Sequence, residues 1–230
     1  MCISAAVRHK NRTSPAFRVV GLGGGMCSGK TMVARLLAEH GWIILDLDCL
    51  VKTFSQKGRA IWKMYVQMLG RFCLDRTGAL DRARIGWLVF RNRKALLIVN
   101  RFVHPLLRQQ VQRCLSASSS RERIIVEGAI LLEAGFLPLL DILVFVEAGP
   151  ELRIRRLVEK GCPEREAIRR VHSQIFLPAL QKRSQLIIYN TGTPGELERS
   201  VERLAETLKN LEPRGVFSPG DPKVGRFGTP

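Results

Sequence analysis

The chain has 230 residues, of which 46% are hydrophobic, so it is long and apolar enough to bury a core and is not a disordered chain. Its formal net charge of +17 predicts polyanionic partners, either nucleic acid, an acidic membrane or phosphate-rich small molecules. The apolar runs are shorter than the roughly 18 residues of a membrane span, so no span is expected. Six scattered cysteines predict a cytoplasmic protein with reduced thiols.

The two ends of the chain differ in composition from its middle. Residues 1–16 are basic and lack the apolar core of a secretory signal, so we expect a disordered N-terminal extension. A start codon assigned too far upstream and a mitochondrial presequence stay open as alternatives. Residues 212–230 are rich in proline and glycine, which predicts a disordered C-terminal tail. The folded domain is therefore expected over residues 17–211.

Strands and helices alternate along this domain. Short apolar runs predict five strands, at Phe17–Leu22, Trp42–Asp46, Arg123–Glu127, Ile142–Val146 and Leu186–Tyr189. Helical periodicity and breaker residues predict helices at Thr31–His40, Glu151–Lys160, Glu164–Gln174 and Glu196–Leu211, and several helices within about 50–115. The pattern is typical of an α/β fold with a five-stranded parallel sheet, a helical insertion at about 50–115 and a basic helical region at about 150–180.

A glycine-rich loop follows the first predicted strand. The stretch GGMCSGKT matches the phosphate-loop pattern G-x-x-x-x-G-K-[ST], and its residues are Gly24, Gly25, Met26, Cys27, Ser28, Gly29, Lys30 and Thr31. Glycines let successive backbone N–H groups point at phosphate oxygens, and the following helix adds its positive end. Lys30 is placed to reach the terminal phosphates and Thr31 to ligate magnesium, so the loop predicts ATP with Mg²⁺ as ligand.

Acidic residues follow the second and third predicted strands. Asp46 and Asp48 lie two residues apart and share one face if the strand continues, and strand ends in a parallel sheet border the ligand crevice. A carboxylate there can accept a proton or help to hold the metal, whereas the simpler reading is a strand end with a capping aspartate. Glu127 ends the third strand, where a carboxylate can serve magnesium, or it is an ordinary loop acid.

A basic segment follows the fourth strand. Arginine side chains that close over phosphates stabilise the charge of phosphoryl transfer, and a lid also excludes water. The alternative is a solvated basic face. The cationic residues of this lid region are Arg153, Arg155, Arg156, Lys160, Arg165, Arg169 and Arg170.

From about Val19 to Leu204 the sequence resembles the dephospho-coenzyme A kinase family, whose members have a P-loop kinase fold. The resemblance lies in an ordered set of motifs: the phosphate loop, ILDLDCL, GALDR at 78–82, His104-Pro105, ILLEAGF, the lid residues Arg156, Arg170, Val171 and Gln174, and Asn190 with Gly192. It implies that Asp48 is the catalytic base, that Arg156 is a catalytic lid arginine, and that Arg156 and Asn190 belong to the nucleotide site. His104 we expect to be a structural histidine in a turn.

Five residues depart from the family pattern. Gly23 stands where threonine is usual, and Glu127 where aspartate is usual. Ala129 replaces a proline, and Lys160-Gly161 replaces Arg-Asp. A lysine keeps the charge but loses the two-pronged grip of arginine on a phosphate.

The resemblance implies transfer of the γ-phosphoryl group of ATP to the ribose 3′-hydroxyl of dephospho-coenzyme A, catalysed with Lys30 and Mg²⁺ at Thr31 and Glu127. The expected partners are these small molecules, with no nucleic acid and no membrane, and the expected state is a monomer or small homo-oligomer. Two alternatives stay open: another small-molecule kinase of this fold, acting on a nucleoside or nucleotide, and a nucleic-acid-binding P-loop protein suggested by the charge alone.

Overall fold

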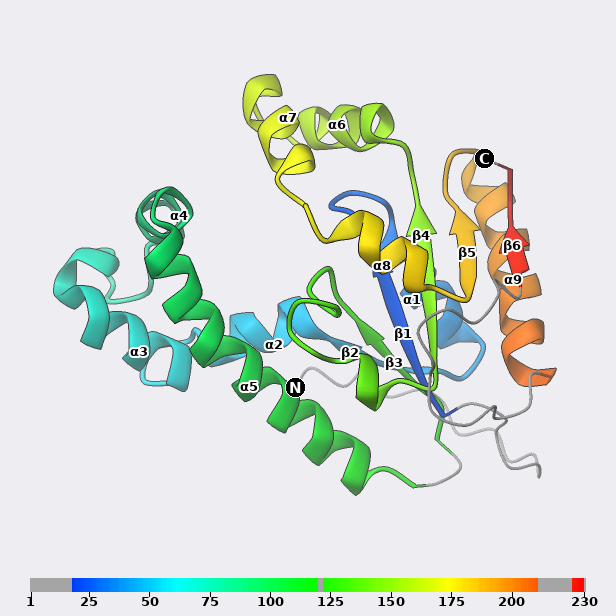
Figure 1. Ribbon diagram of the computed structural model, residues 1–230, viewed down its shortest axis with the longest axis horizontal. Helices are drawn as coiled ribbons and strands as arrows, with labels where there is room; N and C mark the ends of the chain where they lie inside the picture. Colours follow the sequence, from blue (N-terminus) through cyan, green and yellow to red (C-terminus); the bar gives the residue numbers. More distant parts are fainter. Residues whose placement is uncertain (1–17, 120–121, 211–224, 230) are drawn as a thin grey trace. The chain divides into compact units, whose positions relative to one another are not determined.

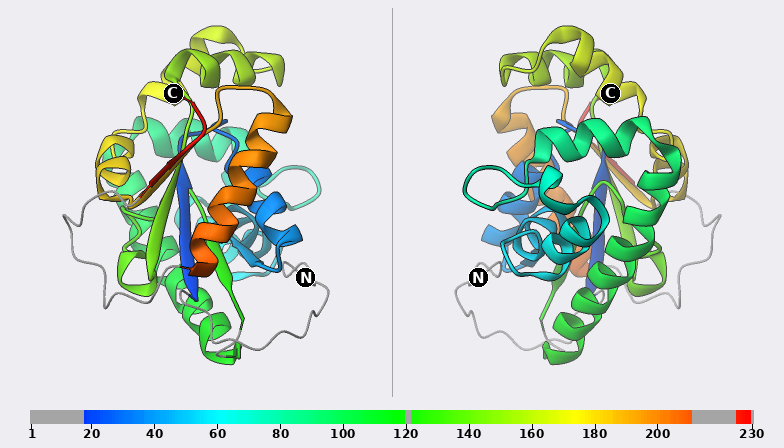
Figure 2. Two further views of the ribbon diagram at one scale, coloured as in Figure 1. Left: turned by 90° about the vertical axis from the view of Figure 1, so that its right-hand side faces the viewer. Right: turned by 90° about the vertical axis from the view of Figure 1, so that its left-hand side faces the viewer.

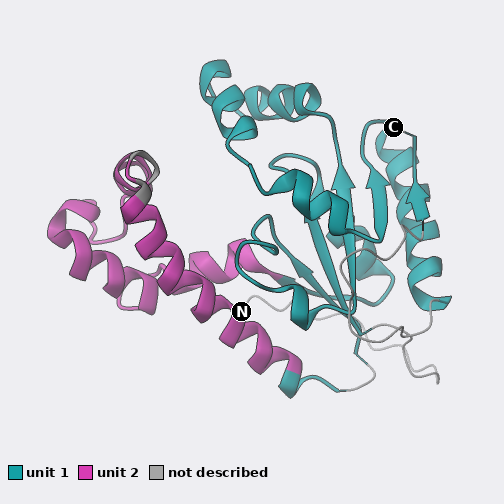
Figure 3. Ribbon diagram, in the orientation of Figure 1, with its two compact units in different colours: residues 1, 3–45, 116–230 teal, residues 2, 46–115 magenta. Residues whose placement is uncertain are grey.

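A computed structural model describes residues 18–119, 122–210 and 225–229. The chain divides into two compact units, coloured separately in Figure 3. One unit contains the sheet and is built from residues up to 45 and from 116 onward, and the other spans Asp46–Leu115. The expected N-terminal extension, residues 1–16, lies outside the described residues.

The sheet has six strands in the order β2-β3-β1-β4-β5-β6. They are β1 (Val19–Gly24), β2 (Ile43–Asp46), β3 (Ile124–Glu127), β4 (Ile142–Glu147), β5 (Leu186–Tyr189) and β6 (Gly225–Phe227). The pairings of β1 with β3 and β4, of β4 with β5, and of β5 with β6 are parallel. The parallel α/β sheet is thus confirmed, and the expected count of five strands is wrong by one.

The sixth strand lies in the segment predicted to be a disordered tail. β6 pairs with β5 in the register Leu186↔Gly225, Ile187↔Arg226 and Ile188↔Phe227. Residues 225–227 are therefore ordered, because the exposed edge of β5 supplies ladder hydrogen bonds that the local sequence does not reveal. Residues 211–224 and 230 lie outside the described residues.

Helices cover both faces of the sheet in the first unit, as Figures 1 and 2 show. Its helices are α1 (Lys30–Glu39), α6 (Pro150–Glu159), α7 (Glu164–His172), α8 (Leu177–Arg183) and α9 (Pro194–Asn210), with a 3-10 turn, η2, at Leu137–Leu139. Side chains alternate along β1, so Val20 and Leu22 face α1 and α9, while Gly23 faces Leu180 of α8. The amphipathic pattern of α9 explains its place, because Leu197, Val201, Leu204 and Leu208 are all buried.

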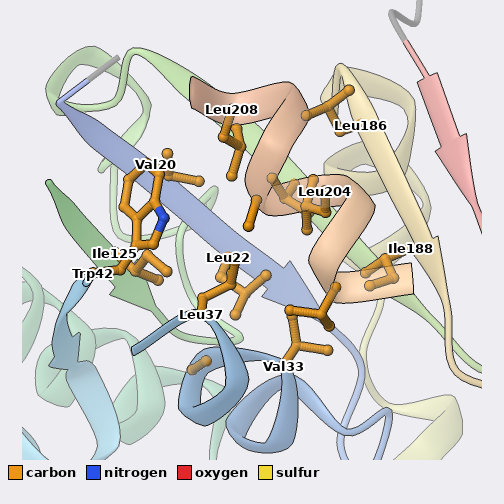
Figure 4. Packing of buried hydrophobic residues seen from close by; sticks show 14 of the residues in the cluster. Val20, Leu22, Val33, Leu37, Trp42, Ile125, Leu186, Ile188, Leu204 and Leu208 are labelled. Atoms are coloured by element: carbon orange, nitrogen blue, oxygen red, sulfur yellow. The ribbon is translucent and has the colours of Figure 1, made fainter. Parts of the chain in front are cut away.

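The main core lies between the sheet and the helices α1 and α9 (Figure 4). Val33 and Leu37 of α1 and Leu204 of α9 meet Leu22 of β1 there. Trp42, fully buried just before β2, belongs to the same cluster. This core fixes the end of β1 relative to the start of α1, and the phosphate loop spans these two points.

The second unit is helical. Its elements are α2 (Leu47–Phe54), α3 (Ala60–Leu69), the 3-10 turn η1 (Gly70–Cys73), α4 (Arg82–Arg91) and α5 (Arg93–Ala117). The GALDR motif makes a turn and a helix start: Gly78 accepts a hydrogen bond from Trp62 Nε1 at 2.9 Å, and Asp81 caps α4 by accepting from the Ala83 and Arg84 N–H groups.

Two local expectations in the second unit were wrong. His104 does not lie in a turn, because α5 continues through Pro105. Burial and the charge of Arg108 lower the pKa of this half-buried histidine. Cys49 is disulfide-bonded, whereas reduced thiols were expected; Cys27, Cys73, Cys114 and Cys162 are free.

Candidate active site

The phosphate loop runs from the end of β1 to the start of α1. Its backbone enters the left-handed region at Cys27 (φ 58°) and at Gly29 (φ 97°), which is the residue before α1. At Gly24 (φ 149°), an added Cβ would lie 2.6 Å from the Val146 carbonyl oxygen of β4. Glycine is therefore required at Gly24 and Gly29 for backbone reasons, as the motif predicts.

The side chains of the motif lysine and threonine both make hydrogen bonds at the loop. Lys30 Nζ donates to the Gly25 carbonyl oxygen at 2.9 Å, so its ammonium group lies against the loop. Thr31 Oγ1 donates to Glu127 Oε1 at 2.8 Å. The Glu127 carboxylate is buried at the end of β3, so its side chain, one methylene longer than the usual aspartate, does reach the loop hydroxyl.

This hydroxyl and carboxylate fit a magnesium ion. Mg²⁺ prefers oxygen ligands and usually takes only one or two from the protein, the rest being phosphate oxygens and water. Ser28, also in the loop, has a fully buried hydroxyl with no hydrogen-bond partner within the described part of the chain. A buried polar atom of this kind is costly unless a ligand or water completes it, so the loop also fits a phosphate.

Arg156 of α6 joins the loop to the end of β5. Its Nη1 donates to the Cys27 carbonyl oxygen at 3.3 Å, and its Nη2 donates to the Asn190 carbonyl oxygen at 3.0 Å. The buried Asn190 in turn donates from Nδ2 to the Ser28 carbonyl oxygen at 2.8 Å. The structure thus brings together the loop, Arg156 and Asn190, three of the features that the sequence predicted for one nucleotide site.

Other cations of the lid region differ in their contacts: one lies near the loop, and two pair with a carboxylate within α7. Lys160 Nζ lies 3.9 Å from Cys27 Sγ and so reaches the loop. Arg170 donates from Nε to Glu166 Oε1 at 2.8 Å within α7, and the same carboxylate pairs with Arg169 at 2.7 Å. These two arginines hold the pKa of Glu166 below its ordinary value, by hydrogen bonding first of all. The Arg170 side chain is therefore engaged in an ion pair within α7.

The paired aspartates do not share one face of a strand. β2 ends at Asp46, and Asp46 Oδ1 accepts from the N–H groups of Asp48 at 2.8 Å and Cys49 at 3.1 Å. Asp46 is thus the N-cap of α2, which is the simpler of the two readings of this motif. Asp48 is exposed in the first turn of α2 and belongs to the second unit.

Sequence reasoning missed the importance of two residues near the loop. Arg153 was only one of several lid cations, and Gln174 only a motif residue, yet Gln174 Oε1 accepts from the Met26 N–H at 2.8 Å and from Arg153 Nη1 at 3.1 Å. One signal was available: Arg153 lies three positions before Arg156, so the two share one side of α6.

One departure from the family pattern has a structural explanation. A Cβ at Gly23 would lie 2.7 Å from Leu180 Cδ2. Leu180 of α8 is itself buried, so it fills the space that a threonine would need at position 23.

A parallel α/β sheet whose first strand leads into this loop, with a hydroxyl–carboxylate pair and an arginine beside it, defines a P-loop phosphotransferase. Residues 18–196 match the family model described as dephospho-CoA kinase. The chain therefore belongs to the dephospho-CoA kinase family.

Individual relatives agree with this assignment. A dephospho-CoA kinase from Bacillus licheniformis is 30% identical over 197 residues, covering 84% of this chain and 98% of the relative. One from Streptomyces avermitilis is 33% identical over 183 residues, covering 79% and 89%. The crystal structure of the protein TT1252 from Thermus thermophilus is similar to this chain, with a TM-score of 0.70 and 28% sequence identity. The match covers 83% of this chain and 97% of that one.

Proposed function

We propose that the protein transfers the γ-phosphoryl group of ATP to the ribose 3′-hydroxyl of dephospho-coenzyme A, giving coenzyme A and ADP. One observation carries the proposal: a phosphate loop whose threonine meets the buried Glu127 lies inside the segment 18–196 that matches the dephospho-CoA kinase family. Both substrates are polyanions, which suits a chain with a net charge of +17.

The loop residues bind and orient the triphosphate. Backbone N–H groups of Gly24–Thr31 donate to phosphate oxygens, and Lys30 neutralises charge at the terminal phosphates. Thr31 and Glu127 would hold a magnesium ion, which would supply positive charge to offset the charge that develops on the phosphates. Arg156, hydrogen-bonded to the carbonyl oxygens of Asn190 and Cys27, brings a second cation to the loop.

Asp48 is proposed as the general base. Its carboxylate orients the 3′-hydroxyl of the acceptor and takes the proton as the oxygen attacks phosphorus. Proton removal assists a reaction whose catalysis rests mainly on positioning and electrostatics. The ordered cap at Asp46 supports the role, because it fixes the backbone from which Asp48 projects.

Release of ADP in a coupled assay tests the substrate. We expect turnover with dephospho-coenzyme A, and little or none with adenosine or nucleoside monophosphates as acceptors. A preference for a nucleoside or nucleotide would instead establish the other small-molecule kinase reading. Lys30→Ala should abolish most turnover, and an unchanged rate would refute the loop assignment.

Two aspartate variants test the base. Asp48→Asn is nearly isosteric but cannot take the proton, so kcat should fall by about 10²–10⁴. Asp46→Asn is the matched control, since asparagine caps a helix as well as aspartate does, and kcat should stay near the wild-type value. A loss below about tenfold in correctly folded Asp48→Asn, checked by circular dichroism, would contradict the assignment.

A further inference from the structure

One side-chain oxygen beside the phosphate loop receives two donors. Gln174 Oε1 accepts from the Met26 backbone N–H at 2.8 Å and from Arg153 Nη1 at 3.1 Å. Met26 belongs to the loop whose N–H groups serve phosphate oxygens in this motif. A loop amide and a guanidinium that converge on one oxygen are the pair of donors that a phosphate oxygen accepts from.

Arg153 is an unusual residue for a structural role. Its side chain is buried, with 7% of its surface exposed, and its Nε has no hydrogen-bond partner within the described part of the chain. Burial lowers the pKa of Arg153, and the nearby carboxylate of Glu147 only partly opposes this effect. Burial likewise raises the pKa of Glu147, and Arg153 only partly opposes that. Within 4 Å, Arg153 has no ion-pair partner among the described residues, so an anion would complete its environment.

The guanidinium also lies directly on the loop. A Cβ at Gly25 would collide with Arg153 Nη1 and would lie 2.8 Å from Arg153 Cζ. The carbonyl oxygen of the same Gly25 accepts from Lys30 Nζ at 2.9 Å. Arg153 and Lys30 therefore meet at one residue of the loop, and the motif lysine marks the end of the loop that holds the terminal phosphates.

We propose that Arg153 and the Met26 N–H together bind an oxygen of the terminal phosphate of ATP, and that Gln174 Oε1 competes with this oxygen for the two donors. Arg153 is thus a substrate-contacting residue, and Gln174 is a neutral occupant that ATP displaces. The inference rests on the proposed use of ATP and adds a specific residue to it.

The test measures nucleotide binding by calorimetry, with magnesium and either ADP or a non-hydrolysable ATP analogue. Arg153→Met should weaken binding of the ATP analogue by about tenfold or more, the size of a lost charge-assisted hydrogen bond, and of ADP by less than about threefold. Arg155→Met is the matched control, because Arg155 is an exposed cation two residues further along α6, and it should change neither affinity beyond about twofold. Arg153→Lys, which keeps the charge, should recover part of the loss and protects the test against a folding defect in Arg153→Met.

Gln174→Ala removes the competing oxygen and leaves both donors in place. We expect affinity for the ATP analogue to be equal to or above that of the wild-type protein, and a tenfold loss would overturn the competing role. If Arg153→Met and Arg155→Met bind the analogue equally well, or if Arg153→Met loses ADP and the analogue equally, the proposal for Arg153 is wrong. If the wild-type protein itself binds no ATP analogue, the proposed function fails instead, so the two failures are distinguishable.

Discussion

Gly29 is under two constraints at once. Its φ of 97° is unfavourable for any residue with a Cβ, and a Cβ there would also collide with Asn190 Nδ2. Gly41 has a similar φ of 87° but open space around it. Comparing substitutions at Gly29 and Gly41 therefore distinguishes the cost of backbone strain from the cost of disturbing the contact between the phosphate loop and Asn190, at the end of β5.

Alanine at the two glycines should therefore have unequal effects. Gly41→Ala should cost about 1 kcal/mol of unfolding free energy, the lower end for a left-handed residue with a side chain. Gly29→Ala should cost about 1–3 kcal/mol more, because Asn190 must move, and it should weaken ATP binding. Urea denaturation and nucleotide titration measure the two quantities. Equal costs would mean that the Asn190 contact does not constrain the loop.

Gly23 and Leu180 show how a local departure from a family pattern is compensated. Because Leu180 occupies the space beside Gly23, Gly23→Thr should lower the free energy of unfolding by about 1–3 kcal/mol through overpacking. Leu180→Ala alone should cost about 2–5 kcal/mol by leaving a cavity. In the double variant the threonine fills part of that cavity, so the total should be about 1 kcal/mol less than the sum. Strictly additive costs would show that the two sites do not share this space.

At the scale of elements, the sequence predicted secondary structure best where the residues of one segment are enough to indicate its helix or strand. The periodicity of α9 and the apolar runs of β3, β4 and β5 were recognised, because the hydrophobic pattern within each segment matches the side chains that it buries. The phosphate loop was recognised because each motif position has a chemical task. By contrast, β1 extends through Gly23 and Gly24, which read as loop residues, because β4 pairs with them.

Elements that depend on distant partners were missed. The break expected at His104-Pro105 does not occur in α5, and α8 was not predicted although its Leu180 packs beside β1. Asp46 and Asp48 were expected to share one face if the strand continued, but the strand ends at Asp46, which caps α2 as the alternative interpretation had it. The contacts of Arg153 with Gly25 and Gln174 join residues more than twenty positions apart, which no local pattern reveals.

The edge strand β6 gives a prediction at the same scale. Phe227 packs against the main core, whereas its neighbour Arg226 is exposed. Phe227→Ala should therefore lower the free energy of unfolding by about 1–3 kcal/mol, less than for a fully buried phenylalanine. Arg226→Ala, the control, should change it by less than about 0.5 kcal/mol. If both variants unfold at the same urea concentration, β6 adds nothing to the core.

For the whole molecule, composition predicted the kind of ligand but not its identity. A net charge of +17 attracts any polyanion, and the ordered motifs were needed to choose among them. The cations also serve different purposes: Arg156 holds the loop, Arg169 pairs with Glu166, and Arg155 and Arg165 are exposed. Within the described residues, no helix is both long and apolar enough to span a membrane.

The exposed surface cations lead to a prediction about salt. If they speed the capture of ATP and dephospho-coenzyme A, kcat/KM should fall about tenfold or more between about 50 mM and about 500 mM KCl, because screening shortens the range of the field. The value of kcat at saturating substrate should fall less, since Lys30 and Arg156 act at short range on bound phosphates. Replacing the exposed Arg165 and Lys182 together by serine should lower kcat/KM at low salt and flatten its dependence on KCl, without changing kcat. A salt dependence that is equally steep in this variant would locate the attraction elsewhere on the surface, and the absence of any dependence in the wild-type protein would exclude steering by charge.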